Sequence, residues 1–313
     1  MRDRLGLLYG LAAYTLWGAF PLYFPLLAPA GAVEVLTQRV LWSLLVCALL
    51  VAALSLAQRR RGRPTVATEL RALARRPRDL GLLGVAAALI GANWLVFIHL
   101  SLTARPVEAS LGYYATPLVS VLLAVVLLRE RLRALQVVAL VLGALAVVLL
   151  TVEVGAPPLL GLSLAVSFAL YGLAKKRIGR GVSALAGLTV ETALLAPLAA
   201  AVVVWLAVTG RATFGTEGPG HALLMASAGV VTAVPLLLFG ASARRLSLTA
   251  VGMLQYLTPT LQLVLGVLVI GEVVPGPRWV GFGLVWLALV VFTVDAVRAG
   301  RRPAGAAPPG PRR

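Results

Sequence analysis

The amino-acid sequence predicts an all-α polytopic membrane protein of ten transmembrane helices, arranged as two inverted five-helix repeats. Three observations lead to this prediction. Of the 313 residues, 60% are hydrophobic and only 12% are charged, whereas a soluble domain carries roughly 25% charged residues. The apolar residues form ten long runs, and one polar, proline-containing frame occurs in both the fourth and the ninth run.

Each apolar run is long enough to cross the hydrocarbon core, which takes about 20 residues in a helix. The runs are continuous rather than alternating, which favours helices over barrel strands. We expect spans at residues 5–27, 33–57, 80–103, 107–128, 134–152, 157–177, 182–208, 220–242, 248–270 and 277–297. No small-residue cleavage site follows the first run, so we expect it to be a retained helix rather than a signal peptide.

The lysines and arginines predict the orientation of the spans, because cytoplasmic loops are enriched in positive charge. With the N-terminus in the cytoplasm, 24 of the 28 lysines and arginines fall in cytoplasmic segments. The outer loops hold Arg105, Arg211 and Arg278. We therefore expect a multi-pass protein of the bacterial inner membrane with both termini in the cytoplasm. Membrane lipid is an expected partner: the basic segment 58–79 is either a solvated loop near anionic headgroups or a basic helix that lies on the membrane surface.

Several other classes of function are disfavoured by the same composition. The net charge of +17 does not indicate nucleic-acid binding, because the arginines lie in short clusters between apolar runs and not on one face of a soluble fold. The single cysteine, Cys47, and two distant histidines, His99 and His221, predict no metal site and no cofactor. The H-E-x-x-H, G-x-S-x-G and Walker A motifs do not occur, so we expect no enzymatic activity and no ATP-driven step.

An internal repeat links residues 112–130 (GYYATPLVSVLLAVVLLRE) to residues 254–272 (LQYLTPTLQLVLGVLVIGE). At an offset of 142, a Y-x-T-P…E frame places Tyr114, Thr116, Pro117 and Glu130 on Tyr256, Thr258, Pro259 and Glu272. A unit of five spans reverses direction, which gives the inverted repeats found in many transporters. We expect a first repeat over 1–153, a second over 154–298, and a disordered basic tail over 299–313.

The proline of each frame, Pro117 or Pro259, lies well within its predicted span. A proline there removes a backbone donor and loosens the helix. These two prolines are therefore either packing kinks or hinges for alternating access.

Three ionisable residues are functional candidates, because a charge within hydrocarbon is costly. They are Arg39 in the second span, Glu108 at the outer start of the fourth, and Glu191 near the middle of the seventh. Arg39 either binds an anionic group of a substrate or forms an ion pair with Glu108 or Glu191. Glu191 is a candidate proton carrier, or a carboxyl group that a neighbouring Thr or Tyr satisfies.

Aromatic and amide side chains at depth are candidates for the wall of a substrate pathway. Aromatic residues also form belts at the membrane interface, and amides also join helices to one another. The candidates are Trp17, Trp42, Asn93, Trp94, Tyr113, Tyr114, Gln255 and Tyr256.

Motifs along nearly the whole chain resemble one family, the RarD-like permeases of the EamA branch of the drug/metabolite transporter superfamily. The matching stretches are YTLWG (14–18), LTQRVLWS (36–43), NWLVF (93–97), EASLGYYATPL (108–118), RER (129–131), SFALYG (167–172), LTVET (188–192), VTAVP (231–235) and QYLTP (255–259). The resemblance implies two five-span repeats, alternating access, and export or exchange of small metabolites or drugs. Gln38 stands where the family pattern has His, which puts a proton relay at that position in doubt, and Thr116 stands where it has Asn.

The sequence thus predicts a secondary-active or facilitative transporter, acting as an exporter of a small organic metabolite or drug by alternating access. The alternative is a membrane receptor or assembly protein that uses the same fold without transport. A polar path through the centre of the molecule favours transport, whereas a dry centre packed with Ala and Leu favours the alternative. The sequence does not predict the substrate, the coupling ion or the oligomeric state.

Overall fold

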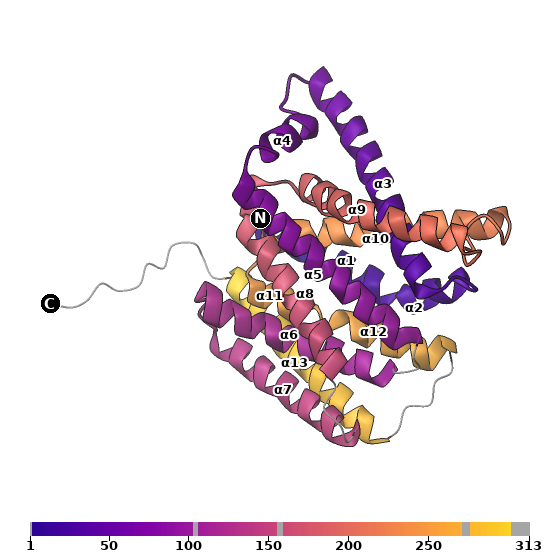
Figure 1. Ribbon diagram of the computed structural model, residues 1–313. Helices are drawn as coiled ribbons and strands as arrows, with labels where there is room; N and C mark the ends of the chain where they lie inside the picture. Colours follow the sequence, from indigo (N-terminus) through magenta and orange to yellow (C-terminus); the bar gives the residue numbers. More distant parts are fainter. Residues whose placement is uncertain (1, 103–105, 155–158, 271–275, 302–313) are drawn as a thin grey trace.

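The computed structural model describes residues 2–102, 106–154, 159–270 and 276–301. Every regular element in these ranges is a helix, so the all-α prediction is confirmed for the described part of the chain. The helices are α1 (Arg2–Gly18), α2 (Phe20–Tyr23), η1 (Phe24–Leu27), α3 (Ala32–Arg60), α4 (Val66–Leu73), α5 (Pro77–Leu102), α6 (Pro106–Leu128), α7 (Ala134–Val154), α8 (Leu159–Ile178), η2 (Gly179–Gly181), α9 (Ala184–Val208), α10 (Pro219–Ala243), α11 (Leu248–Leu254), α12 (Leu257–Leu265), η3 (Gly266–Ile270) and α13 (Gly276–Arg301). Figure 1 shows their arrangement.

Seven helical segments of the described residues are long and apolar enough to cross a membrane, judged by length and composition. They lie in α3, α5, α7, α8, α9 and α10 and in the run from α11 to η3. Shorter apolar stretches cover Gly112–Leu128 in α6 and Trp279–Asp295 in α13. These helices coincide with nine of the ten predicted spans, and the remaining one, residues 5–27, is interrupted.

Two prolines interrupt that first segment. Helix α1 ends at Gly18, and the chain continues as the short helices α2 and η1. Pro21 and Pro25 each lie at the start of one of these short helices, where a missing N–H group is tolerated. In the interior of one long helix, each would remove a backbone hydrogen bond and clash with the preceding turn.

The segment 248–270 is broken for a similar reason. Helix α11 ends at Leu254 and α12 begins at Leu257. Pro259 has no N–H to donate to the carbonyl of Gln255, which instead accepts from Thr258 N at 3.2 Å. By contrast, α6 continues through Pro117 as one helix. The two halves of the chain therefore differ where their sequence frames are most alike.

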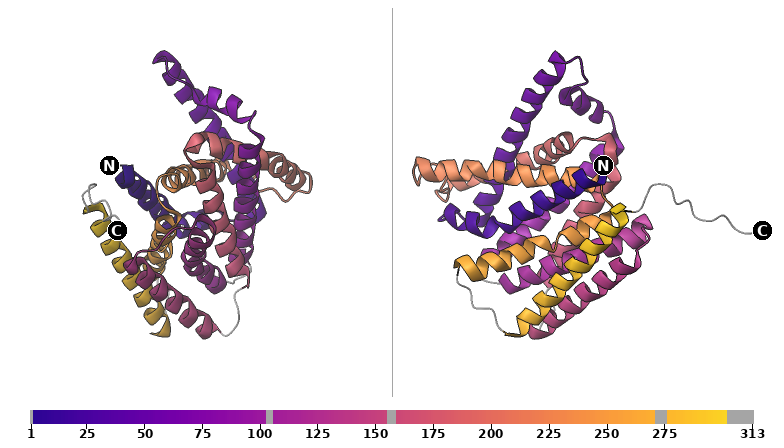
Figure 2. Two further views of the ribbon diagram at one scale, coloured as in Figure 1. Left: turned by 90° about the vertical axis from the view of Figure 1, so that its left-hand side faces the viewer. Right: turned by 180° about the vertical axis from the view of Figure 1, so that it is seen from behind.

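The helices pack in pairs that join the first half of the chain (residues 2–154) to the second half (159–301). Helix α3 packs along α9, α7 along α13, and α6 against α11. Helix α8 packs against α5 and α6, and α1 packs against α10 and α12. In Figures 1 and 2, α7 and α13 form one flank of the bundle, and α3, α4 and α9 form the opposite one. The largest buried cluster lies among α1, α3, α5, α8, α9 and α10, and a second lies among α6, α7, α11 and α13.

Glycines permit the closest helix contacts. A Cβ on Gly112 of α6 would lie 2.4 Å from the carbonyl oxygen of Gly161 on α8. A Cβ on Gly229 of α10 would lie 2.5 Å from the backbone of Trp42 on α3. Because backbone atoms cannot move aside as a side chain can, any larger residue at either position would push the two helices apart.

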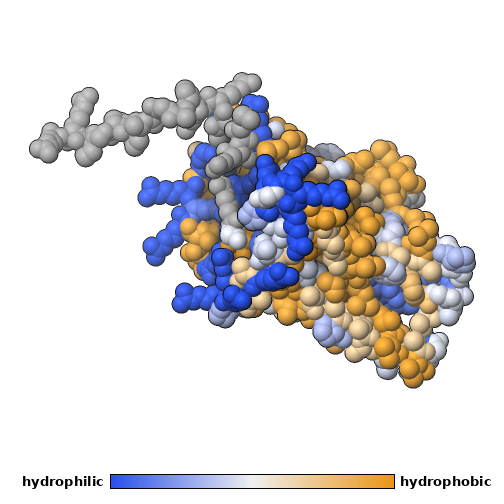
Figure 3. Space-filling view, turned by 90° about the horizontal axis from the view of Figure 1, so that it is seen from above, coloured by the Kyte–Doolittle hydropathy of each residue, from blue (hydrophilic) through white to orange (hydrophobic). Residues whose placement is uncertain are grey.

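The surface is apolar over most of its area and strongly hydrophilic at one end. Large apolar side chains such as Leu198, Val208 and Leu223 are exposed, as expected for contact with lipid. Figure 3 shows the most hydrophilic residues gathered in one part of the molecule beside the hydrophobic surface. The start of α1 and the end of α13 lie near each other, because Arg4 and Val297 line the same cavity.

Candidate functional site

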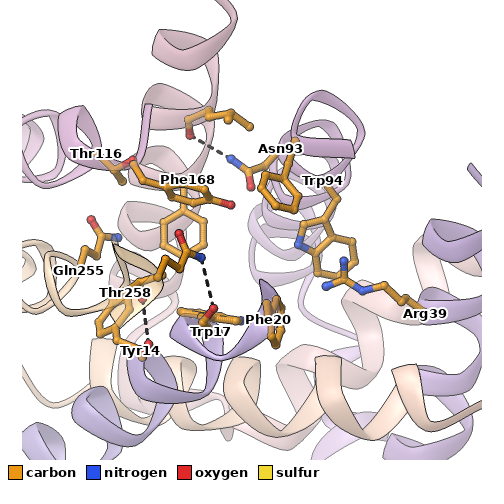
Figure 4. Close-up of a pocket in the computed structure, with 14 residues that line it drawn as sticks. Tyr14, Trp17, Phe20, Arg39, Asn93, Trp94, Thr116, Phe168, Gln255 and Thr258 are labelled. Carbon is orange, nitrogen blue, oxygen red and sulfur yellow. Dashed lines mark hydrogen bonds between the residues drawn. The ribbon is translucent and has the colours of Figure 1, made fainter. Parts of the chain in front are cut away.

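A cavity of about 70 Å³ lies at the centre of the bundle, between the two halves of the chain (Figure 4). Its lining is mostly aromatic and polar, and it comes from α1, α2, α3, α5, α6, α8, the α11–α12 break and α12. The residues are Tyr14, Trp17, Phe20, Arg39, Asn93, Trp94, Phe97, Tyr113, Thr116, Leu164, Phe168, Gln255, Thr258 and Gln262. The centre is therefore lined by aromatic and polar side chains, and it is not the Ala/Leu-packed core that the receptor or assembly alternative predicts.

Arg39 carries the positive charge in this cavity. Its side chain extends from α3, and the residue is only 4% exposed. The guanidinium carbon lies 4.8 Å from the ring centroid of Trp94, 5.3 Å from that of Phe24 and 5.8 Å from that of Phe20. Figure 4 shows its guanidinium beside the Trp94 ring. Three aromatic rings thus surround a cation that has little contact with water.

Asn93 joins α5 to α8 at the cavity wall. Its Nδ2 donates to the carbonyl oxygen of Leu164 and to Ser167 Oγ, both at 2.9 Å. These bonds use both amide hydrogens, so the remaining capacity of the side chain is that of its acceptor oxygen.

Three hydrogen bonds hold α1 of the first half to α11 and α12 of the second. Tyr14 OH donates to the carbonyl oxygen of Val251 at 3.3 Å. Thr258 Oγ1 donates to the carbonyl oxygen of Tyr14 at 2.9 Å, and Gln262 Nε2 donates to that of Trp17 at 3.4 Å. The cavity wall is thus built across the contact between the halves.

Glu191 lies outside the cavity, in an ionic cluster of its own. Lys175 Nζ on α8 donates to Glu191 Oε1, and Tyr171 OH donates to Glu191 Oε2 at 3.2 Å. The alternative that Arg39 pairs with Glu191 is therefore wrong. Lys175 belongs to a basic run at the end of the predicted span 157–177, where a lysine is expected to lie in water. The structure instead buries it on α8, because Glu191 supplies its counter-charge.

Stacked aromatic rings connect this cluster to the cavity. The Tyr171 ring stacks on Phe239, with centroids 5.6 Å apart and an interplanar angle of 16°. Phe239 in turn contacts Trp17 and Phe168, both of which line the cavity. The cavity wall and the residue that holds the Glu191 carboxylate are thus joined by contacting aromatic rings.

Six of the predicted site residues meet at the cavity: Trp17, Arg39, Asn93, Trp94, Tyr113 and Gln255. Trp42 lies elsewhere, where Nε1 donates to Gln38 and the ring packs on Phe214. Glu108 and Glu272 have side chains outside the described residues.

Tyr114 and Tyr256, the matched tyrosines of the repeat, both lie in the second buried cluster and not in the cavity. Tyr114 follows Tyr113 by one position, which turns it about 100° around the helix, and it packs on Phe282. The hydroxyl of Tyr256 lies against Gly143 of α7, where a Cβ would come within 2.2 Å. Their match in sequence reflects a shared packing position.

Sequence reasoning missed eight residues of the lining: Tyr14, Phe20, Phe97, Thr116, Leu164, Phe168, Thr258 and Gln262. Most are aromatic or aliphatic residues in apolar runs, where nothing in one sequence marks them. Thr116 and Thr258 are matched by the repeat frame, and Gln262 is a polar amide one helical turn beyond Thr258. Those three carried a usable signal.

A second cavity, of about 1190 Å³, opens on the side of the chain termini. Arg4, Arg131 and Arg245 contribute positive charge to its wall. Glu130 lies there too, and its carboxylate accepts from Leu248 N at 2.9 Å, Thr249 N at 3.2 Å and Thr249 Oγ1 at 2.8 Å. Glu130 thereby fastens the end of α6 to the start of α11. Among the described residues, no cluster of His, Cys, Asp and Glu could hold a metal ion.

Comparison with known proteins identifies the family. The EamA-like transporter family matches the chain twice, over residues 4–152 and 157–294. Protein RarD of Streptomyces exfoliatus is 48% identical over 300 residues, covering 96% of this chain and 91% of its own. Protein RarD of Escherichia coli K12 is 38% identical over 301 residues, covering 96% and 98%.

More distant relatives agree. A Pseudomonas aeruginosa protein named chloramphenicol-sensitive protein RarD is 32% identical over 300 residues, covering 96% of this chain and 97% of its own. One solved crystal structure of a protein shares the fold, with a TM-score of 0.70 at 24% identity, covering 95% of this chain and all of that one. The chain is a RarD-like permease of the EamA-like transporter family.

Proposed function

We propose that this permease is a secondary transporter that exports a small organic metabolite or drug by alternating access through the central cavity. The observation that carries the proposal is the position of that cavity, whose wall is built from both halves of the chain. Transporters with internal repeats bind substrate near the membrane midplane at the contact between the repeats, and broken helices commonly form the site. The break before Pro259 lies at this cavity, because Gln255 belongs to the lining.

The helix pairing supports an arrangement of ten spans in two inverted five-span repeats. In the two halves, α3 corresponds to α9, α6 to α11 and α7 to α13. Each of these helices packs against its own counterpart, so exchanging the halves leaves these pairs unchanged. The contact of α5 with α8 corresponds to that of α10 with α1. The two matches to the family, over 4–152 and 157–294, divide the chain at the same place. With both termini in the cytoplasm, the positive charges fall mainly inside.

The halves also carry matched charged positions. Leu36 and Thr37 precede Arg39 as Leu188 and Thr189 precede Glu191. Thr37 Oγ1 and Thr189 Oγ1 each donate to the backbone carbonyl four residues earlier. Inversion of one half places Arg39 toward the outer face and Glu191 toward the cytoplasm. The same place in the fold thus holds a cation at the cavity in one half and an ion pair beside the cavity in the other.

Proton coupling, rather than facilitated diffusion, is the mode that the ionic cluster favours. Glu191 faces Lys175 and Tyr171 from α8, and Cys47 from α3 is close enough to interact electrostatically with Glu191 and Lys175. Protonation of Glu191 would remove the counter-charge of Lys175. Because Tyr171 stacks on Phe239 beside the cavity, such a change has a physical link to the substrate site.

Transport by purified protein in proteoliposomes tests the proposal. A thermal-shift screen against amino acids, nucleosides and amphenicols selects compounds that stabilise the folded state, and counterflow of each selected compound is then measured. We expect counterflow that is lost in Thr116→Trp, which fills the cavity, and retained in Ser163→Trp, whose side chain is on the exposed face of α8. Absence of stabilisation and counterflow across the whole panel would refute transport of these classes.

A further inference from the structure

The hydrogen-bonding capacity of Arg39 is largely unused by the protein. A guanidinium has five N–H donors, and Nε gives one hydrogen bond, to Thr232 Oγ1 at 2.8 Å. Among the residues that the structure describes, no acceptor takes a hydrogen bond from its two terminal nitrogens, and no carboxylate lies within ion-pair distance. The residue is nevertheless 96% buried and lines the cavity.

A buried cation with spare donors is a costly arrangement unless something compensates it. The rings of Trp94, Phe24 and Phe20 supply part of the compensation through their negatively polarised faces. Rings offer no lone pairs for the four remaining N–H groups. The fork of two terminal nitrogens is the geometry that binds a carboxylate through two parallel hydrogen bonds.

The rest of the cavity suits a flat apolar body. Trp17, Phe97, Tyr113 and Phe168 present ring surfaces, and planar groups pack on such surfaces in offset or edge-on arrangements. Asn93 offers an acceptor oxygen beside them, since both its amide hydrogens are used. A volume of about 70 Å³ is small beside the roughly 300–1,000 Å³ of drug-sized sites. The space is closer in scale to a single ring than to a large drug.

We propose that the cavity is selective for small organic anions: a carboxylate held by the terminal nitrogens of Arg39, on a ligand whose aromatic ring packs against the contacting rings of Trp17 and Phe168. This inference rests on the proposed function, because it specifies the substrate class of that same cavity. It also specifies why the residue is an arginine, since lysine lacks the planar fork and is more strongly hydrated.

Matched probes test the inference by binding alone, without a transport assay. The probes are benzoate, phenylacetate and 3-phenylpropionate, each beside its neutral amide, at millimolar concentration and neutral pH. Binding to the purified wild-type protein is read from intrinsic tryptophan fluorescence, because Trp17 and Trp94 line the cavity, and from the shift in melting temperature. We expect at least one carboxylate to bind roughly tenfold or more tighter than its amide, because hydrogen bonds to charged groups are the stronger ones.

Arg39→Gln should abolish the preference for the carboxylate and leave both members of the pair equally weak. Arg211→Gln is the matched control, because its guanidinium lies 5.4 Å from the ring centroid of Trp205, outside the cavity. Equal binding of every carboxylate and its amide by the wild type, or no binding of any carboxylate, would overturn the inference even if Arg39→Gln does not fold. Counterflow of neutral compounds without carboxylate preference would overturn it too, while the proposed transport function would stand.

Discussion

Lys175 of α8 and Glu191 of α9 form an ion pair in which both side chains are buried, with exposed fractions of 7% and 1%. The sequence places Glu191 near the middle of its span, whereas Lys175 belongs to a basic run, Lys175–Arg177, in the last turn of α8. Burial of both charges together means that each depends on the other.

Removing one partner of this pair should destabilise the protein strongly. Lys175→Met leaves the Glu191 carboxylate without a cation, and loss of one partner of a buried pair typically costs about 3–5 kcal/mol. We expect a lower melting temperature and poor recovery from detergent. The double variant Lys175→Met/Glu191→Gln, which removes both charges, should recover much of the loss. A single variant as stable as the wild type would show that the pair does not hold α8 to α9.

The same carboxylate should govern the pH dependence of transport. Glu191→Gln cannot bind or release a proton, and neither can the more stable Lys175→Met/Glu191→Gln, so we expect the transport rates of both variants to vary much less with pH than the wild-type rate. The comparison is made by counterflow and by gradient-driven uptake in proteoliposomes over a series of pH values. Asp79→Asn is the matched control, since Asp79 pairs with Arg76 at the surface. An unchanged pH profile in Glu191→Gln would exclude Glu191 as the proton carrier.

A larger residue at the close contact of α6 with α8 should destabilise the protein. Gly112→Ala would place a Cβ 2.4 Å from the Gly161 carbonyl oxygen, and overpacking of this kind costs about 1–3 kcal/mol. Gly84→Ala on α5 is the control, because the nearest atom there is Leu194 Cδ1 at 4.0 Å. It should be neutral or stabilising by up to about 1 kcal/mol through helix propensity. Equal melting temperatures for the two variants would contradict the close contact.

Hydropathy was sufficient to locate the long helices, because a span of apolar residues has few alternatives in lipid. It did not locate the interruptions. Pro21 and Pro25 split the first segment and Pro259 accompanies the break in the ninth, whereas Pro117 lies within a continuous helix. The same residue type in the same sequence frame has two outcomes: the carbonyl of Gln255 accepts from Thr258 N in the break before Pro259, whereas α6 continues through Pro117.

The site was only partly predictable for a related reason. Arg39 and Asn93 stand out as polar residues in apolar runs, and both reach the cavity. Phe168 and Tyr14 look like any core aromatic in the sequence, and only the packing of α8 and α1 brings them to the cavity. Lys175 was missed because a basic run at the end of a span normally lies in water.

In alternating access, the cavity opens to each side of the membrane in turn, and labelling of single cysteines measures this opening from each face. Cys47 is the single cysteine, so Cys47→Ser provides a background for Thr116→Cys or Thr258→Cys, the matched threonines that line the cavity from the two halves. Thr216→Cys and Ala74→Cys, which the charge distribution predicts to lie in an outer and a cytoplasmic loop, report sidedness. With a membrane-impermeant thiol reagent, we predict that each cavity cysteine reacts from both faces, in right-side-out and in inside-out vesicles. Reaction from one face only, with and without substrate, while both sidedness controls behave as expected, would contradict alternating access.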